Sequence, residues 1–487
     1  MKQKFNFKQW WIGGLIGGGI LLGLMILKSL SWQDFQPPRG PKVRLMDEST
    51  LQPKAERLGQ MIQLQTISGK GAKPQEFIKA HSLLEQQFPK VHANLKRDII
   101  SNYSLLYTWE GEKPSLEPVI LLAHLDVVPV ELSSLPQWQE KPFSGKIKDG
   151  FLWGRGALDD KGSMMAILEA AETLLARGHK PQRTLYFAFG HDEEVGGTQG
   201  AAKISQVLEK KGVKAWFSLD EGMAVLGGTI TPFGQPTAMV GLAEKGYLSV
   251  ELKVEHEGGH SSMPRYPTTL EILGIAFQRL HDSPLEARLE GPAEEMLEWA
   301  AAELGWTKQF VVSNLWLFRP LVTRWLSGEM PMIVRTTAVP TMVSGGVKDN
   351  VIPSQARAVV NLRLLPGDRV NVVLIRLRRL LDGLPITVTP FGPTREASKV
   401  SSSKNPAFQM LATVIRHTFP ETMVAPGLMP AATDTPHYAK VSQESYRFAP
   451  YQLEASDLKR IHGINEKIAV EDYGRMIQFY EHLMDDL

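Results

Sequence analysis

The chain has 487 residues, which is more than one ordinary domain holds, and its 43% hydrophobic content is enough for a sizeable core. The formal net charge of +2 gives no reason to expect nucleic acid as a partner. There is no cysteine, which excludes disulfides, thiolate metal ligands and a cysteine nucleophile.

The first segment in chain order is an uncharged, mostly apolar run at residues 10–27 (WWIGGLIGGGILLGLMIL), flanked by lysines on both sides. Its 18 residues are at the lower limit for a membrane span of ~20 residues. A cleaved signal peptide is the alternative, but the run is long for one and ends in a poor cleavage site. We therefore expect an N-terminal transmembrane helix within 1–30 and a tether at 31–48. The positive-inside tendency then places the body of the protein on the non-cytoplasmic side.

Residues 49–244 alternate apolar strand-like runs with helix-like stretches. The runs at 119–128 and 184–189 have the composition of buried strands, and 162–178 carries apolar residues at helical spacing. This alternation predicts an α/β domain with a mostly parallel sheet. Reactive groups in such a sheet gather at the carboxyl ends of the strands.

The pattern changes at residues 245–394, where an inserted α+β domain of ferredoxin-like type is expected. The order strand-helix-strand-strand-helix-strand is typical of that arrangement. The chain would return to the first domain at 395–487. The expected elements of the insertion are strands at 247–254, 336–343, 356–364 and 386–389 and helices at 268–281 and 370–381.

One part of the insertion, residues 285–333, is too apolar for a connecting segment. One interpretation is a helical excursion that packs on its own domain or on a second subunit. The other is a hydrophobic lip near the active site that receives an acyl chain or an apolar side chain. The first is favoured.

Three short motifs carry groups that bind metal: His124-Leu125-Asp126, Asp159-Asp160-Lys161-Gly162 and His191-Asp192-Glu193-Glu194. Each follows or ends an apolar run. Imidazole and carboxylate without thiol are the ligands of hydrolytic zinc sites. Alone, each motif has an ordinary structural explanation, but together they predict a metallohydrolase.

With Gly154-Arg155-Gly156-Ala157, Asp220-Glu221-Gly222 and His462-Gly463-Ile464-Asn465-Glu466, the chain resembles the di-zinc aminoacylase and carboxypeptidase S family. The resemblance runs from about residue 50 to the C-terminus. Within that family it is most similar to the branch of carboxypeptidase S and the N-fatty-acyl-amino-acid synthase/hydrolases. It implies a zinc-exopeptidase-like catalytic domain and two zinc ions per subunit.

The resemblance also implies the metal ligands. His124 would bind one zinc and His462 the other, with Asp159 bridging both and Glu194 completing one site. The last ligand would come from Glu221 or Asp220, and Glu221 is favoured. A cis peptide between Asp159 and Asp160 is implied as well.

The remaining roles follow from the same resemblance. Glu193 would be the general base, and Asp126 would orient the imidazole of His124. In the insertion, which would act as a lid and dimerisation domain, His260 would stabilise the oxyanion, often across a homodimer interface. Asn350 and Arg363 would hold the free carboxylate of the substrate. His437 lies in a similar segment and receives no role.

These roles imply hydrolysis of an amide bond next to a free carboxylate, in a peptide or an N-acyl amino acid. Two alternatives remain. One is an aminopeptidase or dipeptidase on the same di-zinc scaffold. The other is a catalytically inactive, membrane-anchored binding ectodomain, which would have lost ligands that are all present here.

Overall fold

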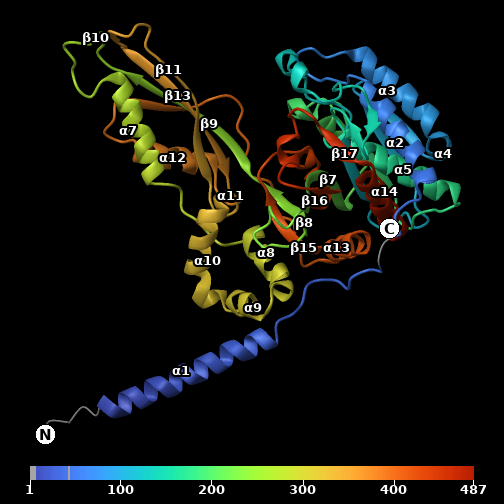
Figure 1. Cartoon of the computed structure of the whole chain (residues 1–487), viewed down its shortest axis with the longest axis horizontal. Coiled ribbons are helices and arrows are strands. Elements are labelled where there is room, and N and C mark those ends of the chain that lie inside the picture. Colours follow the sequence, from blue (N-terminus) through green and yellow to red (C-terminus); the bar gives the residue numbers. More distant parts are fainter. Residues whose placement is uncertain (1–6, 42–43) are drawn as a thin grey trace.

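The computed structural model describes the backbone of residues 7–41 and 44–487, with side chains described from residue 16 onward. Figure 1 shows a large lobe, which holds the C-terminus, and a smaller lobe built on a separate sheet. The lobes join where β8 (Thr237–Glu244) continues into β9 (Gly246–Glu255). Lys245 alone separates these two strands, so a single residue connects the sheet of the large lobe to the sheet of the smaller lobe at this point.

The large lobe is built on an eight-stranded mixed sheet. Its centre is parallel, since β6, β3, β7 and β16 run the same way, and the antiparallel pairs include β1–β2 and β2–β6 at one edge. The expected α/β class with a mostly parallel sheet is confirmed. Across the sheet the strands are β1 (Lys96–Ile100), β2 (Ser104–Trp109), β6 (Leu185–Gly190), β3 (Val119–His124), β7 (Ala215–Leu226), β16 (Ser442–Leu453), β8 and β15 (Met423–Met429).

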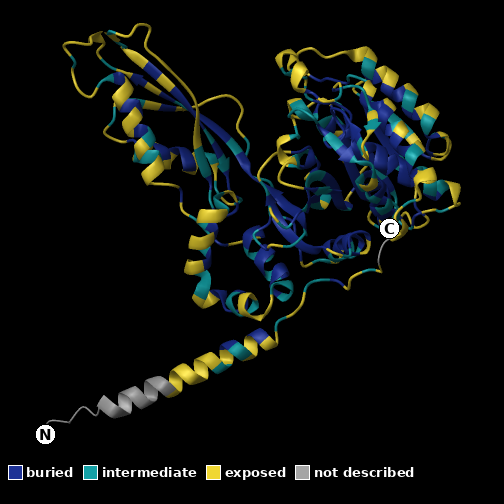
Figure 2. Cartoon of the chain, viewed as in Figure 1, coloured by how far each residue is buried: buried dark blue, intermediate teal, exposed yellow. Residues whose placement is uncertain are grey.

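Helices cover both faces of this sheet, because alternate residues of the buried strands point to opposite sides. In β3, Leu121 packs into the larger core and Leu122 into the smaller one. Figure 2 shows the buried strands between helices whose outer faces are exposed. The larger core includes α2 (Glu48–Gln63), α3 (Pro74–Gln87), α4 (Pro89–Asn94), α5 (Lys161–Ala176), α13 (Pro406–Thr418) and α14 (Val470–Asp485), and the smaller one α6 (Ala201–Lys210).

A three-stranded sheet beside the large lobe joins distant parts of the chain. It consists of β4 (Lys146–Lys148), β5 (Phe151–Trp153) and β17 (Lys467–Ala469), in the order β17-β5-β4. The pairing of β17 with β5 fixes the C-terminal segment next to residues 151–153.

The smaller lobe has its elements in the expected order. Its four-stranded antiparallel sheet packs against two helices over a separate core. A capping box between Thr268 and Glu271 begins the first of these helices. The domain limits at residues 245 and 395 stay a prediction. The sheet runs β11 (Thr337–Gly345), β13 (Gln355–Leu364), β9 and β14 (Ile386–Pro390), the helices are α7 (Thr269–Asp282) and α12 (Val370–Leu380), and a distal ribbon pairs β10 (Gly259–His260) with β12 (Val351–Ile352).

The favoured interpretation of the apolar segment at 285–333 is a helical excursion that packs on its own domain or on a second subunit. Leu285 does belong to the core of the smaller lobe, but most of the buried side chains of the segment pack on the main sheet instead. The segment forms helices whose apolar side chains, such as Met296 and Leu297, pack with Met423 and Ala425 at the β15 edge of the main sheet. The reason is that this edge strand presents apolar side chains that need cover. The helices are α8 (Pro292–Ala300), α9 (Trp306–Ser313), α10 (Leu315–Glu329) and α11 (Pro331–Val334).

The N-terminal helix α1 (Phe7–Leu30) contacts α9 near its C-terminal end, where Met25 and Ser29 are buried. Among the helices of the described residues, none is long and apolar enough to cross a membrane. The expected span at 10–27 lies partly outside the residues whose side chains are described, which begin at 16.

Candidate metal centre

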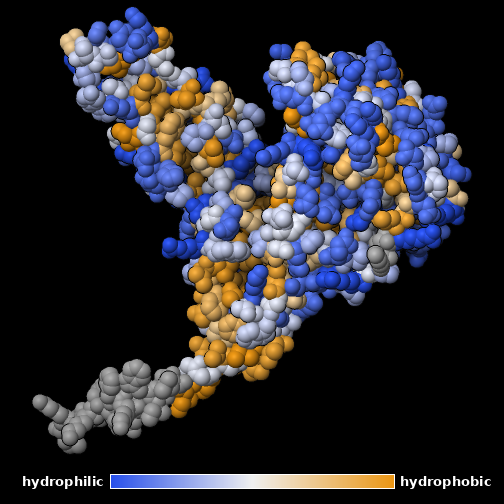
Figure 3. All heavy atoms as spheres, in the orientation of Figure 1, coloured by the Kyte–Doolittle hydropathy of each residue, from blue (hydrophilic) through white to orange (hydrophobic). Residues whose placement is uncertain are grey.

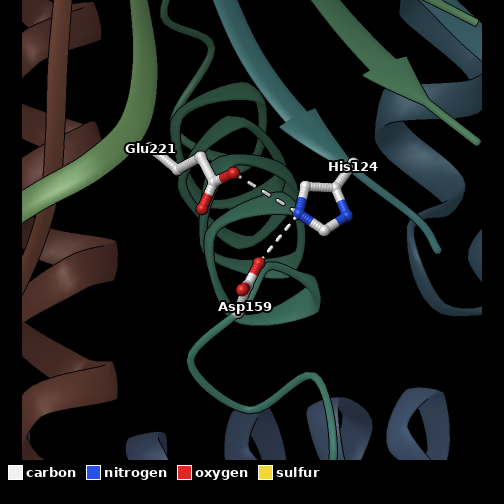
Figure 4. Close-up of side chains that lie close together, drawn as sticks. All are labelled: His124, Asp159 and Glu221. Carbon is white, nitrogen blue, oxygen red and sulfur yellow. Dashed lines mark hydrogen bonds and ion pairs between the residues drawn. The ribbon is translucent and has the colours of Figure 1, made fainter. Parts of the chain in front are cut away.

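His124, the last residue of β3, is buried at the carboxyl end of the central strands. Its Nδ1 lies 2.9 Å from the carbonyl oxygen of Asp126, so Nδ1 carries the hydrogen and donates it. Nε2 is then left to face two carboxylates, with Asp159 Oδ1 at 2.9 Å and Glu221 Oε1 at 3.4 Å (Figure 4). In this tautomer the lone pair of Nε2 and the two carboxylate oxygens are all acceptors, so a cation is needed between the nitrogen and the oxygens.

A second group of the same kind shares Asp159. The other oxygen of that carboxylate, Oδ2, lies 3.0 Å from His462 Nε2. Glu194 Oε2 lies 3.1 Å from the same nitrogen, and its second oxygen is buried without a hydrogen-bond partner. The ligand atoms lie within 4.8 Å of one another in each group. Asp159 thus offers one oxygen to each of two adjacent sites.

These residues fit a pair of divalent metal ions. One would be held by His124, Asp159 and Glu221, and the other by Asp159, Glu194 and His462. Imidazole and carboxylate ligands without thiolate suit a hydrolytic metal. The buried, unpartnered oxygen of Glu194 is the kind of group that a bound cation would satisfy.

The electrostatics of the cluster show an excess of negative charge. Burial raises the pKa of Glu221 well above its usual range, and the neighbouring Asp159 adds to the shift. Hydrogen bonds to Asp159 and Glu194 raise the pKa of His462 to about 10. Burial opposes charge on His124, yet its carboxylate neighbours hold the pKa of this imidazole well above normal. The cluster therefore attracts protons where metal cations would supply the same positive charge.

Glu221, not Asp220, lies beside His124. Both are on β7, and consecutive residues of a strand point to opposite sides. The Asp220 carboxylate accepts hydrogen bonds from Thr435 Oγ at 2.6 Å and from the backbone N–H of Glu221 at 3.0 Å. These partners hold the Asp220 carboxylate away from the cluster, and Glu221 is the one of the two that faces His124.

Glu193 lies in a short turn (Glu193–Val195) that Asp126 holds in place. The two carboxylate oxygens of Asp126 accept the backbone N–H groups of Glu193 and Glu194, each at 3.2 Å. Asp126 therefore positions the turn through its side chain, and it meets His124 chiefly through its carbonyl oxygen. Burial raises the pKa of Glu193 well above normal, and the negative charge of Glu221 and Asp159 raises it further.

An ion pair that was not predicted from the sequence brings the two halves of the centre together. Arg155 is buried and donates to Glu466 Oε2 at 2.5 Å. It also donates to the carbonyl oxygens of His462 and Gly463, 307 and 308 residues away in sequence. Glu466 accepts backbone N–H groups of the 156–158 segment. Arg155 lies in the Gly154–Ala157 motif and Glu466 in the His462–Glu466 motif. Their opposite charges were the feature of the sequence from which the ion pair could have been predicted. The peptide bond between Asp159 and Asp160 is cis.

The substrate-side residues are divided between the two ends of the smaller lobe. His260 is on β10, in the distal ribbon at the far end from the lobe junction (Figure 1), where the backbone carbonyl oxygen of Asn350 accepts a hydrogen bond from the backbone N–H of Ser261. Arg363 lies at the junction end, with its guanidinium 4.8 Å from the centre of the Tyr247 ring. The length of β13 separates the two ends by roughly 30 Å. Within one chain, therefore, Asn350 and Arg363 cannot hold one carboxylate together. His437 Nε2 lies 3.0 Å from the carbonyl oxygen of Gly196, the residue that follows the Glu193 turn.

Comparison with known proteins agrees with this centre. Residues 120–486 match the model of peptidase family M20/M25/M40. The chain is 38% identical to the probable carboxypeptidase S-like 2 of Dictyostelium discoideum, over 99% of this chain and 94% of that protein. It is 39% identical to the N-fatty-acyl-amino acid synthase/hydrolase PM20D1 of Mus musculus, over 81% and 80% of the two chains. A metallo-carboxypeptidase of Sulfolobus solfataricus shares the fold, with a TM-score of 0.63 at 19% identity over 90% of this chain and 99% of that one.

The class defined by fold and site is a metal-dependent hydrolase of amide bonds. The chain belongs to peptidase family M20/M25/M40.

Proposed function

We propose that the protein uses two zinc ions to hydrolyse the amide bond next to a free carboxylate, in a peptide or an N-acyl amino acid. The observation that carries this proposal is the position of Asp159 between the imidazoles of His124 and His462. A carboxylate shared in this way suits two adjacent metal ions better than one. Zinc is favoured by the imidazole and carboxylate ligand set.

Bound zinc would polarise the carbonyl of the substrate and lower the pKa of the attacking water. Glu193 is the proton carrier of the site: it takes the proton of the water and delivers it to the leaving nitrogen. Its turn is held by Asp126, so the carboxyl group stays beside the metal ligands. Its raised pKa suits a group that must both accept and release a proton.

Positive charge at the lobe junction supports a substrate with a free carboxylate. Arg363 is half-buried there, and the positively charged side chains of Lys245 and Arg395 lie near it. The fork of an arginine pairs with both oxygens of a carboxylate. Relatives named carboxypeptidase S and N-fatty-acyl-amino acid synthase/hydrolase support the same substrate class.

The test is a matched set of substrates in which one end is blocked at a time. Hydrolysis of N-acyl amino acids and of N-blocked dipeptides should persist, while the corresponding C-terminal amides should react far more slowly. The opposite pattern, with a free amino group required and a blocked carboxylate tolerated, would assign the protein to the aminopeptidases. Arg363→Ala should raise KM for the free acid and have little effect on its amide.

A homodimer would explain the distant position of His260. We infer that His260 of a second copy donates to the oxyanion, because in its own chain this exposed residue lies on the distal ribbon at the far end of the smaller lobe. Mixing two inactive variants, Glu193→Gln and His260→Ala, tests this inference. Hybrid dimers should recover part of the activity. If the mixture stays as inactive as its components, the second copy does not supply the histidine.

We further propose that the N-terminal segment anchors the protein in a membrane, with the catalytic lobe on the non-cytoplasmic side. The support is the apolar run at 10–27 and the lysines before it. Resistance to carbonate extraction, together with protease access to the catalytic lobe only from the non-cytoplasmic side, is the expected result. Release of the intact chain by carbonate would contradict it.

A further inference from the structure

The exposed face of α10 is apolar, contrary to what a helix on a water-facing surface normally shows. Trp316 is 57% exposed, Leu317 47%, Leu321 65% and Trp325 46%. Leu317, Leu321 and Trp325 recur every four residues and lie on one face of the helix, and Trp316 is exposed on an adjoining side. The opposite face is also apolar, since Leu315, Val322 and Leu326 are buried in the core that this segment shares with the main sheet. α10 therefore carries large apolar side chains on its exposed side as well as on its buried side.

A cavity of about 300 Å³ opens on this face. Leu321 and Trp325 line it and are also exposed, so the cavity adjoins the exposed face of α10. The other walls are mainly apolar and include Phe233 and Val311. The face is thus both apolar and recessed.

Helix α1 is fixed to the same surface by buried polar contacts. The hydroxyls of Ser29 and Ser313 lie 2.6 Å apart, and the Asn314 side chain donates to the carbonyl oxygen of Met25 at 3.3 Å. The side chain of Gln309 donates to the carbonyl oxygen of Ser29 at 3.2 Å. Figure 3 shows hydrophobic atoms that extend from the α9–α10 region to the near end of α1. The direction in which α1 leaves the body is therefore set by α9 and by Asn314, the residue just before α10.

From these observations we infer that the exposed face of α9 and α10 docks on a lipid bilayer, with its tryptophans in the interfacial layer. The face is continuous with the exposed apolar side chains of α1, among them Leu24 and Leu27. Tryptophan is enriched where hydrocarbon meets headgroups. The exposed cations Lys28, Lys308 and Arg324 lie on the same elements and suit lipid phosphates. The catalytic lobe is then held at a fixed orientation to the membrane, and does not swing on a tether.

The absence of cysteine makes a site-specific test clean. Leu317→Cys in the full chain places one thiol on the proposed face, and Val372→Cys places one on α12 of the smaller lobe, where the residue is 58% exposed. Each is labelled with an environment-sensitive fluorophore and bound to vesicles of phosphatidylcholine and phosphatidylglycerol. A second set of vesicles carries bromine on the acyl chains. Amide-hydrolase activity equal to that of the unsubstituted chain shows that each variant is folded.

The expected result is a blue-shifted emission at position 317 that the brominated lipid quenches strongly, with no quenching at 372. Vesicle-bound protein whose label at 317 stays in water would overturn the inference. A blue shift that needs no lipid and grows with protein concentration would also overturn it, because a second copy of the chain would then cover the face.

Discussion

Arg155 and Glu466 form a buried ion pair that closes the loop carrying His462 against the segment carrying Asp159. The guanidinium bonds the carbonyl oxygen of His462 itself, and Glu466 holds the backbone just before Asp159. The geometry of the second metal site thus depends on a contact between residues 311 apart in sequence. His462 also has a φ of 58°, a left-handed backbone conformation that non-glycine residues rarely adopt, so the contacts of this loop must stabilise it.

Arg155→Met is expected to lower the free energy of unfolding by about 3 to 5 kcal/mol, because it leaves the Glu466 charge buried and unpaired. It should also reduce the metal bound per chain, since the His462 loop loses its support. Chemical denaturation and metal analysis measure the two effects. Lys148→Met removes a surface ion pair with Glu140 and serves as the control. An Arg155→Met protein with full metal content and unchanged stability would contradict this account of the loop.

Glu193→Gln should retain both metals and lose about 10²- to 10⁴-fold in kcat, the usual contribution of general acid–base catalysis. The amide keeps the size of the side chain but cannot carry the proton. Metal content and kcat are compared with those of the unsubstituted protein. A turnover within a few-fold of normal would remove Glu193 from the mechanism.

The adjacent pair Asp220 and Glu221 allows a matched comparison. Glu221→Ala should lose one metal per chain and nearly all activity. Asp220→Asn should keep the metal, because its carboxylate bonds to Thr435 and not to the cluster, and should lower the melting temperature. Metal stoichiometry for both variants decides the question, and loss of metal in the asparagine variant alone would reverse the assignment.

Removal of metal by a chelator should abolish activity and lower the melting temperature. Without a cation, the carboxylates of Asp159, Glu194 and Glu221 repel one another in a largely buried site. Added zinc should restore both quantities, because a ligand that binds only the native state stabilises it. In the His462→Ala variant the zinc-dependent rise in melting temperature should be smaller. An unchanged rise would argue against His462 as a ligand.

Lys245, between β8 and β9, provides a prediction on pH and stability. Burial, together with the positive charge of Arg363, lowers the pKa of this ammonium group to about 8 from an ordinary 10.5, although the charge of Asp368 opposes the shift. Between these two values the unfolded chain binds more protons than the folded one, so this group makes stability rise with pH across that window. In Lys245→Met the contribution disappears. Denaturation curves from pH 7.5 to 10.5 should therefore differ in slope between the two proteins, and parallel curves would contradict the shift.

The strands and helices of the large lobe follow from local sequence. Val119–His124 is a continuous apolar run and Lys161–Ala176 has helical periodicity, so both elements occur close to where the pattern predicts them. The helical spacing within 285–333 is equally local. The surface on which that segment packs cannot be predicted from local sequence, because an apolar helix fits many apolar surfaces. Only the assembled structure places α8 against β15 and leaves the face of α10 exposed.

The sequence by itself determined the kinds of residue in the metal centre, because its motifs place imidazole and carboxylate groups, which bind hydrolytic metals, at the ends of predicted strands. The tertiary structure decided which of them meet. It turned Glu221 and not Asp220 toward His124, through strand alternation and the bond to Thr435. It joined His462 to Asp159 through the Arg155–Glu466 pair, and it separated Asn350 from Arg363. Each of these outcomes depends on contacts between residues far apart in sequence, which local pattern does not encode.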